Sequence, residues 1–197
     1  DPVSYAFIRT VSACLAVVAG ARSRTCFTES LVLFIRTVAP LSILDRQKNP
    51  CKIDFYNEIS TATERDGWIL FAHCIPSSEL KRLHVRESYQ CIAESIQSGI
   101  QKAIITGTPG IGKSLFLIYL LWKLVKATER VLIVYSPDVI YYDGKGGTFE
   151  FDEIPSPVDH EFWTKDLWCL FDAKQKASKD LDFPYNTCRT VLSTSPR

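Results

Sequence analysis

Apolar and polar residues are patterned most clearly in the second half of the chain. Apolar side chains recur at helical spacing at Tyr89, Ile92 and Ile96, and the same spacing continues to Ile100. Gly99 stands where such a helix would end. The short apolar run Lys102–Thr106 follows at once and predicts a strand. We therefore expect a helix that leads directly into a strand.

Three further apolar runs predict strands, at Val131–Tyr135, Leu167–Asp172 and Arg189–Leu192. The segment Leu115–Lys126 lies between the predicted strands at 102–106 and 131–135. It is apolar on nearly all sides, as a helix packed inside an α/β layer is. Strands that alternate with helices favour a parallel sheet with helices on its faces. The pattern thus predicts the α/β class.

Weaker signals predict smaller elements. Trp68–Ala72 has the composition of a strand, and Pro76–Glu79 has the residues of a helix start. Tyr141–Gly147 is typical of a hairpin turn flanked by aromatic side chains. The acidic, proline-containing stretch after it is expected to form a surface loop with a short helix near Asp159–Trp163.

The first 48 residues differ from the rest. Val11–Ala21 is an apolar run with the outline of a signal-peptide core, and Leu31–Leu44 is a second apolar run. The first run is either a cleavable signal or a buried segment, and it is shorter than the roughly 18 residues of a membrane-spanning helix. Asp45–Asn49 is a polar break before Pro50. We divide the chain into an unassigned hydrophobic segment (1–48), a helical or irregular lead-in (49–100) and the α/β domain (101–197).

Composition removes several classes of function. Of the 197 residues, 46% are apolar and 23% are charged, which excludes wholesale disorder. Lysine and arginine total 23 against 22 acidic residues, so no charge surplus indicates binding to nucleic acid or to an anionic membrane. The seven cysteines form no Cys-x-x-Cys pair, which argues against a zinc site. Because the chain contains no Met, we expect it to be a piece of a longer protein.

A phosphate-binding motif follows the strand Lys102–Thr106. Eight residues satisfy the pattern G-x-x-x-x-G-K-[ST] of a P-loop, namely Gly107, Thr108, Pro109, Gly110, Ile111, Gly112, Lys113 and Ser114. Glycines let the backbone curl so that its N–H groups point at phosphate oxygens, and the start of the next helix favours an anion. In such a loop Lys113 reaches the β- and γ-phosphates, and the Ser114 hydroxyl ligates Mg²⁺.

A P-loop also needs a carboxylate on a second strand to hold Mg²⁺. Asp172 is our candidate because it ends an apolar strand, and its distance along the chain fits P-loop enzymes with an extra strand between the two motifs. Asp138 is the competitor, although a turn residue after proline is the more frequent role of such an aspartate. Ser193 either senses the γ-phosphate or belongs to a turn. Ala173 occupies the position at which many ATPases of this class carry a water-activating glutamate, so hydrolysis is an open question.

The second half of the chain resembles a known family. The strings VRESYQCIAESI, KAIITGTPGIGKSLFLIYLLWKLV, YYDGKGG, DLWCLFDAK and TVLSTSPR occur in order between residues 85 and 197 and are similar to the P-loop region of Crinkler-type effectors, relatives of the retrotransposon hot spot proteins. The resemblance implies secreted, modular proteins that act inside host cells, often in nuclei. Some members of the family carry a C-terminal nuclease-like module.

These patterns together predict a truncated P-loop NTPase domain. We expect a three-layer core with a parallel sheet of the extra-strand type, preceded by an irregular or helical N-terminal segment. The first functional hypothesis is a Mg²⁺-dependent ATPase in which Lys113, Asp172 and Ser193 are catalytic. ATP is the default nucleotide because the chain has no Asn-Lys-x-Asp run for guanine. The alternatives are a nucleotide-binding interaction switch that acts on a host protein or an attached module with little hydrolysis, and, more weakly, a small-molecule kinase.

Overall fold

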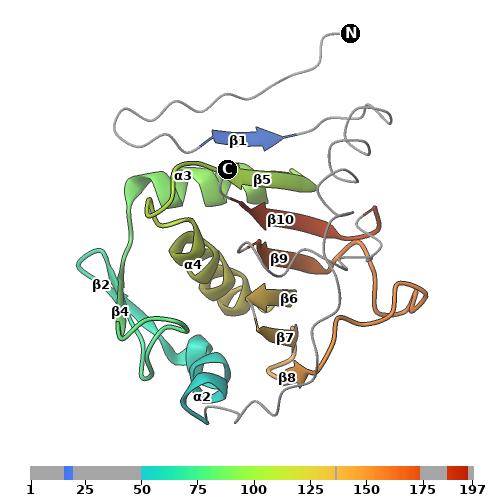
Figure 1. Cartoon of the computed structure of the whole chain (residues 1–197), viewed down its shortest axis with the longest axis horizontal. Coiled ribbons are helices and arrows are strands. Elements are labelled where there is room, and N and C mark those ends of the chain that lie inside the picture. The colour runs from blue at the N-terminus through green and yellow to red at the C-terminus, as the bar shows by residue number, and fades with distance from the viewer. Residues whose placement is uncertain (1–15, 20–49, 136, 174–185, 195–197) are drawn as a thin grey trace, which may run out of the picture.

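A computed structural model of the chain describes residues 16–19, 50–135, 137–173 and 186–194 (Figure 1). The two apolar runs of the first 48 residues lie outside these ranges, apart from the short strand β1 (Ala16–Ala19). The polar break before Pro50 lies outside them as well, and helix α2 (Pro50–Glu58) begins directly after it.

The main sheet has seven strands in the order β1-β5-β10-β9-β6-β7-β8. The four central strands β5, β10, β9 and β6 are parallel to one another. Strands β1, β7 and β8 are antiparallel to their neighbours. The bounds are β5 (Lys102–Thr106), β6 (Arg130–Tyr135), β7 (Asp138–Asp143), β8 (Thr148–Phe151), β9 (Trp168–Asp172) and β10 (Arg189–Ser193). The predicted strands are confirmed, but the sheet is mixed rather than parallel. Only two residues separate β6 from β7, and so short a connection joins only antiparallel neighbours.

Strand β10 is the last in the chain, yet it lies between β5 and β9. The strand that precedes the glycine-rich loop is therefore separated by one strand from the strand that ends in Asp172. The spacing of the two motifs fits an extra strand between them, but it did not indicate which strand of the chain lies there. Figure 1 shows β5, β10, β9 and β6 stacked side by side, with α4 to their left.

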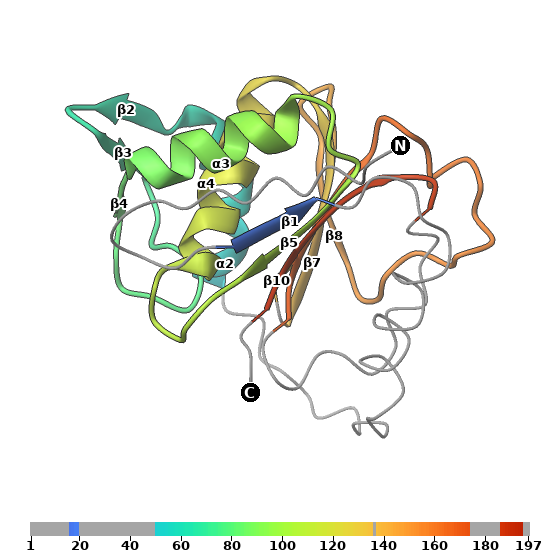
Figure 2. The same cartoon turned by 90° about the horizontal axis from the view of Figure 1, so that it is seen from above.

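Helices cover one face of the sheet. Helix α4 (Lys113–Lys126) packs across β6, β9 and β10, and helices α3 (Glu87–Gln97) and α2 lie on the same side (Figure 2). Four leucines of α4 are fully buried, namely Leu117, Leu120, Leu121 and Leu124. In the described part of the chain, no helix is long and apolar enough to cross a membrane.

The opposite face of the sheet differs from the prediction. Its cover in the described residues is the segment between β8 and β9, which is anchored by the buried Trp163. The short helix predicted near Asp159–Trp163 is wrong, because these residues form turns. The Asp159 side chain accepts a hydrogen bond from the Phe162 amide (3.1 Å), which closes a single turn that does not continue. The three-layer arrangement is thus not found in the described ranges.

The lead-in contains a small antiparallel sheet that the sequence did not reveal. Its strands are ordered β2-β3-β4, with a tight turn at Asp66 and Gly67 (φ 51° and 74°) between the first two. The bounds are β2 (Thr63–Arg65), β3 (Trp68–Leu70) and β4 (Arg82–His84), and a short 3-10 helix, η1 (Ile59–Thr61), precedes them. The predicted strand at 68–72 is confirmed but ends at Leu70.

The helix start predicted at Pro76–Glu79 is wrong. These residues form a turn between β3 and β4, in which the Ser78 hydroxyl accepts a hydrogen bond from the Leu80 amide (3.1 Å). Leu80 is 52% exposed, so no apolar face follows the start signal. A serine side chain that bonds to a nearby amide stabilises a turn as readily as it caps a helix.

Candidate functional site

The glycine-rich loop of residues 107–112 joins β5 to α4. Gly110 and Gly112 have φ angles of 84° and 97°, a region that residues with a side chain rarely adopt. Gly112 is also the N-cap of α4 and offers no side-chain cap to the helix. The first amides of α4 are therefore left to face the loop, and such a helix start favours an anion.

Lys113 begins α4 and extends its amine back across the loop. Its Nζ donates hydrogen bonds to the carbonyl oxygens of Gly107 (2.7 Å) and Thr108 (2.9 Å), and the residue is only 6% exposed. Burial lowers the pKa of Lys113, and the nearby Asp172 carboxylate partly offsets that shift. The amine therefore lies within the curve of the loop and within electrostatic reach of Asp172.

Asp172 and Ser193 lie at the carboxyl ends of neighbouring strands. Ser193 is opposite Asp172 on β9 and opposite Ile105 on β5. Because side chains alternate along a strand, Asp172 points to the same face as the buried Leu170, which packs in the core beneath α4. Asp172 is 5% exposed and Ser193 is 1% exposed. Both polar side chains are thus placed on the helix-covered face, at the end of the sheet where the loop lies.

A shared property connects these residues. In the part of the chain that the structure describes, the buried polar or charged side chains other than tyrosine and cysteine are Lys113, Asp172 and Ser193. Burial of such groups is unfavourable unless they are hydrogen-bonded or serve a site. In open α/β sheets the crevice at the carboxyl ends of the strands is where ligands bind. The structure brings together the three residues that the sequence offered as catalytic candidates.

The same residues fit a magnesium–nucleotide complex. Ser114 lies half-buried in the first turn of α4, directly after Lys113. Mg²⁺ keeps several waters and takes phosphate oxygens as ligands, so one hydroxyl and one carboxylate from the protein suffice. Within the described ranges, no group of three or more His, Cys, Asp or Glu side chains forms a metal site of the all-protein kind.

The competing aspartate serves another part of the molecule. Asp138 begins β7 opposite Tyr135, which is itself opposite Asp172, so two strand spacings separate the two carboxylates. Burial and the Asp138 carboxylate raise the pKa of Tyr56 well above its usual range. Asp138 therefore faces helix α2, whereas the Asp172 carboxylate interacts electrostatically with the Lys113 amine. Ala173 follows Asp172 and brings no carboxylate to the site.

Sequence reasoning missed two residues that contact the loop. Arg86 Nη1 donates a hydrogen bond to the Ile111 carbonyl (2.9 Å), and the Tyr89 hydroxyl donates one to the Gly112 carbonyl (2.8 Å). In the sequence, Tyr89 is one apolar position of a predicted helix. No spacing rule connects it to a loop that lies beyond the next strand.

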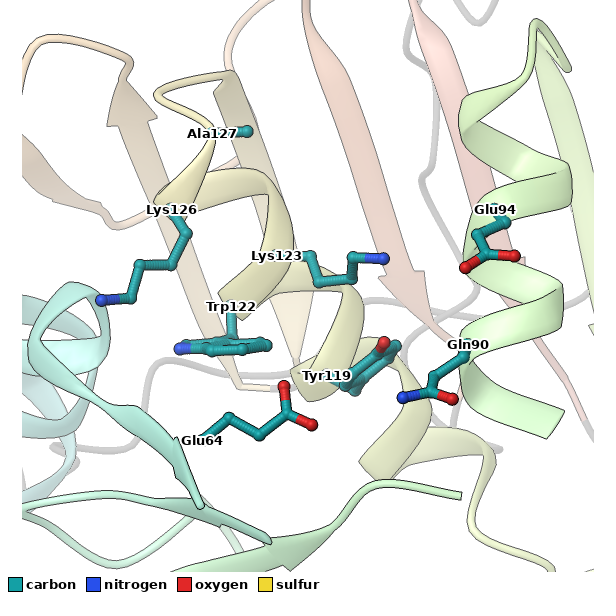
Figure 3. Close-up of a pocket in the computed structure, with 8 residues that line it drawn as sticks. All are labelled: Glu64, Gln90, Glu94, Tyr119, Trp122, Lys123, Lys126 and Ala127. Carbon is teal, nitrogen blue, oxygen red and sulfur yellow. The ribbon is translucent and has the colours of Figure 1, made fainter. Parts of the chain in front are cut away.

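A groove runs along the second half of α4 (Figure 3). The rings of Tyr119 and Trp122 lie on its floor, with the amine of Lys123 5.8 Å from the centre of the Tyr119 ring. Two carboxylates, Glu64 and Glu94, and a second lysine, Lys126, also line it. The opposite charges balance, so the groove presents no charge surplus that would select an ion.

Two curated proteins of Phytophthora infestans match this chain, Crinkler effector protein 15 and Crinkler effector protein 16. Each is 33% identical over 168 residues, which cover 83% of this chain. The chain is related to the Crinkler-type effectors. The chain spans 26% of the length of the two relatives. No family model matches it, and no solved structure matches it.

Proposed function

We propose that this chain is a Mg²⁺-dependent, ATP-binding P-loop domain of a Crinkler-like effector. The observation that carries the proposal is the burial of Lys113, Asp172 and Ser193 beside a loop whose pattern is G-x-x-x-x-G-K-[ST]. Buried charged side chains are frequent at functional sites, because a site uses their unusual environment. The helix start at Lys113 adds favourable backbone dipoles for an anion.

Each residue has a separate role in this proposal. The backbone N–H groups of residues 110–113 and the Lys113 amine bind the phosphate oxygens, and the Ser114 hydroxyl and Asp172 hold the metal ion. Ser193 reaches the γ-phosphate from the end of β10. Mg²⁺, when bound, neutralises phosphate charge. We assign adenine as the base because the chain lacks the Asn-Lys-x-Asp run typical of guanine sites.

The wider role follows from the relatives. Because two Crinkler effectors share a third of their matched residues with this chain, we propose that it belongs to a secreted protein that acts in a host cell. The nucleotide state of the domain would then control binding of a host protein or of an attached effector module. Nuclear action is part of the same proposal.

A second candidate is a nucleotide switch that binds ATP and hydrolyses little. It is favoured by Ala173, whose methyl side chain cannot take a proton from water. The Ala173 amide donates to the Ser193 carbonyl (2.9 Å), so the position is held within the site by its backbone. A slow enzyme and a switch differ in turnover and not in binding.

The test is ATP binding to the complete protein by calorimetry in the presence of Mg²⁺. Replacing Lys113 by Ala removes charged hydrogen bonds to phosphate and should weaken binding about 10- to 100-fold. Lys123→Ala is the matched control, since this lysine lies on the same helix but lines the groove of Figure 3. Equal affinities of the wild type and Lys113→Ala would contradict the proposal.

Two further measurements test the contribution of Mg²⁺ to ATP binding and the rate of ATP hydrolysis. Asp172→Asn should remove most of the gain in ATP affinity that Mg²⁺ provides while leaving metal-free binding intact. Phosphate release by the wild type then separates the two candidates. Turnover well above that of Lys113→Ala favours the ATPase, and turnover equal to it favours the switch.

A further inference from the structure

The outer side of the glycine-rich loop is held by helix α3. The carbonyl oxygens of Ile111 and Gly112 accept the hydrogen bonds from Arg86 Nη1 (2.9 Å) and the Tyr89 hydroxyl (2.8 Å) described above. Both donors come from the first turn of α3 and its N-cap, a segment that precedes the loop strand β5. Two successive peptide groups of the loop are thus tied to an element outside it.

These bonds help to fix which way the loop amides point, together with the first bond of α4, in which the Phe116 amide donates to the same Gly112 carbonyl (2.8 Å). In a trans peptide group the C=O and the N–H point in opposite directions. The Ile111 carbonyl shares its peptide group with the Gly112 amide, and the Gly112 carbonyl shares its peptide group with the Lys113 amide. Holding both carbonyls against α3 therefore turns both N–H groups away from α3. A loop that binds phosphate needs its N–H groups on the inner side.

The Tyr89 side chain is rigidly placed for this role. It is 2% exposed, and its ring packs against Phe116 and Tyr119 at centroid distances of 5.5 and 5.8 Å. The Arg86 guanidinium lies 5.6 Å from the centre of the same ring. Burial raises the pKa of Tyr89, with Arg86 as a smaller opposing effect, so the hydroxyl remains a donor at neutral pH.

The glycine at position 112 is part of the same arrangement. A Cβ atom at Gly112 would collide with the Tyr89 hydroxyl and would lie 3.5 Å from Arg86 Nη1. At Gly110, where φ is also positive, a Cβ atom would meet open space. Gly112 therefore leaves room for the two α3 side chains to approach the backbone, in addition to permitting its φ angle.

We propose that Arg86 and Tyr89 are positioning residues that hold the phosphate loop in its binding conformation and link it to α3. The proposal rests on the proposed function for its ligand, the triphosphate of ATP. The alternative is that both side chains only pack α3 against α4. The Tyr89 hydroxyl distinguishes the two, because Tyr89→Phe keeps the ring and removes only the bond to the loop.

The experiment combines amide hydrogen exchange without nucleotide and ATP binding with Mg²⁺, both on the complete protein. Tyr89→Phe should speed exchange of the amides of residues 110–113 and weaken ATP binding about fivefold, the effect of one neutral hydrogen bond. Arg86→Gln should do the same, with about a tenfold loss, because its donor is charged. Tyr119→Phe and Arg82→Gln are the controls, from the same aromatic cluster and from strand β4, and should change neither measurement.

The outcomes separate this inference from the proposed function. Unchanged loop exchange and unchanged ATP affinity in both variants would overturn the inference, even if Lys113→Ala abolishes binding. If the variants exchange their loop amides faster but the wild type itself binds no ATP, the link between the loop and α3 stands. The role in positioning the loop for phosphate is then overturned. Equal losses in Tyr89→Phe and Tyr119→Phe would assign the effect to packing and overturn the inference.

Discussion

Gly112 combines a positive φ of 97° with crowded surroundings, since a Cβ atom there would meet the Tyr89 hydroxyl. Gly110 has a similar φ of 84° but open space around it. The two glycines of this loop therefore have different physical reasons to be glycine. One is backbone freedom alone, and the other is backbone freedom with close approach of a neighbouring element.

We predict that Gly112→Ala destabilises the protein more than Gly110→Ala does. Both alanines bear the roughly 1–2 kcal/mol of the left-handed conformation. Only Gly112→Ala also displaces Tyr89 and its hydrogen bond, which adds about 1 kcal/mol. Urea unfolding of the two variants measures the difference. Equal free energies of unfolding would show that Tyr89 moves aside without cost.

Helix α4 is the element on which the core depends. Its run of leucines, isoleucine and aromatic residues is buried on nearly all sides because the sheet covers one face and α3 and η1 contact others. In the structure it is a core helix with Lys126 exposed at its far end.

We predict that Leu121→Ala lowers the free energy of unfolding by about 2–5 kcal/mol, because Leu121 is 0% exposed and its loss leaves a cavity. Lys126→Ala on the exposed end of the same helix should change stability by less than about 0.5 kcal/mol. Thermal or urea unfolding provides both values. A Leu121→Ala variant as stable as the wild type would contradict the burial of this helix.

Across the whole molecule, Arg130 joins segments that are distant in sequence. From the first residue of β6 its guanidinium donates to the Tyr141 hydroxyl (2.9 Å), the Thr164 hydroxyl (2.6 Å) and an Asp166 carboxylate oxygen (3.1 Å). It also bonds to the carbonyl of Phe162 (3.2 Å). These contacts fasten the segment between β8 and β9 to the sheet face that lacks described helices.

We predict that Arg130→Ala destabilises the protein by about 1–3 kcal/mol, through the loss of charged hydrogen bonds. Hydrogen bonding to Thr164 and to Arg130 lowers the pKa of Asp166. A carboxyl with a lowered folded-state pKa stabilises the protein above its unfolded pKa, and this contribution is lost as the pH falls through the folded value. The gap in stability between wild type and Arg130→Ala should therefore narrow below about pH 4.

Urea unfolding at pH 7 and at pH 3 measures that gap. Arg65→Ala, an exposed arginine of β2, is the matched control and should leave stability nearly unchanged at both pH values. A gap for Arg130→Ala that stays constant with pH would show that Asp166 contributes nothing to the contact.

The sequence by itself determined the elements whose causes are local. The predicted strand Lys102–Thr106 agrees with β5 at both ends, and the predicted helix after the loop begins two residues early as α4. Apolar periodicity and the run of glycines act over a few neighbouring residues, so they can be interpreted without the fold. Local signals also misled, as at Pro76–Glu79, because serine and proline favour turns as well as helix starts.

Only the tertiary structure decided which residues meet. Asp172 and Ser193 were candidates by residue type and by position at strand ends, but their shared burial beside Lys113 depends on β10 inserting between β5 and β9. The bond from Tyr89 to Gly112 depends in the same way on how α3 packs. Strand order and helix packing are set by long-range burial summed over the whole core, which no local spacing encodes.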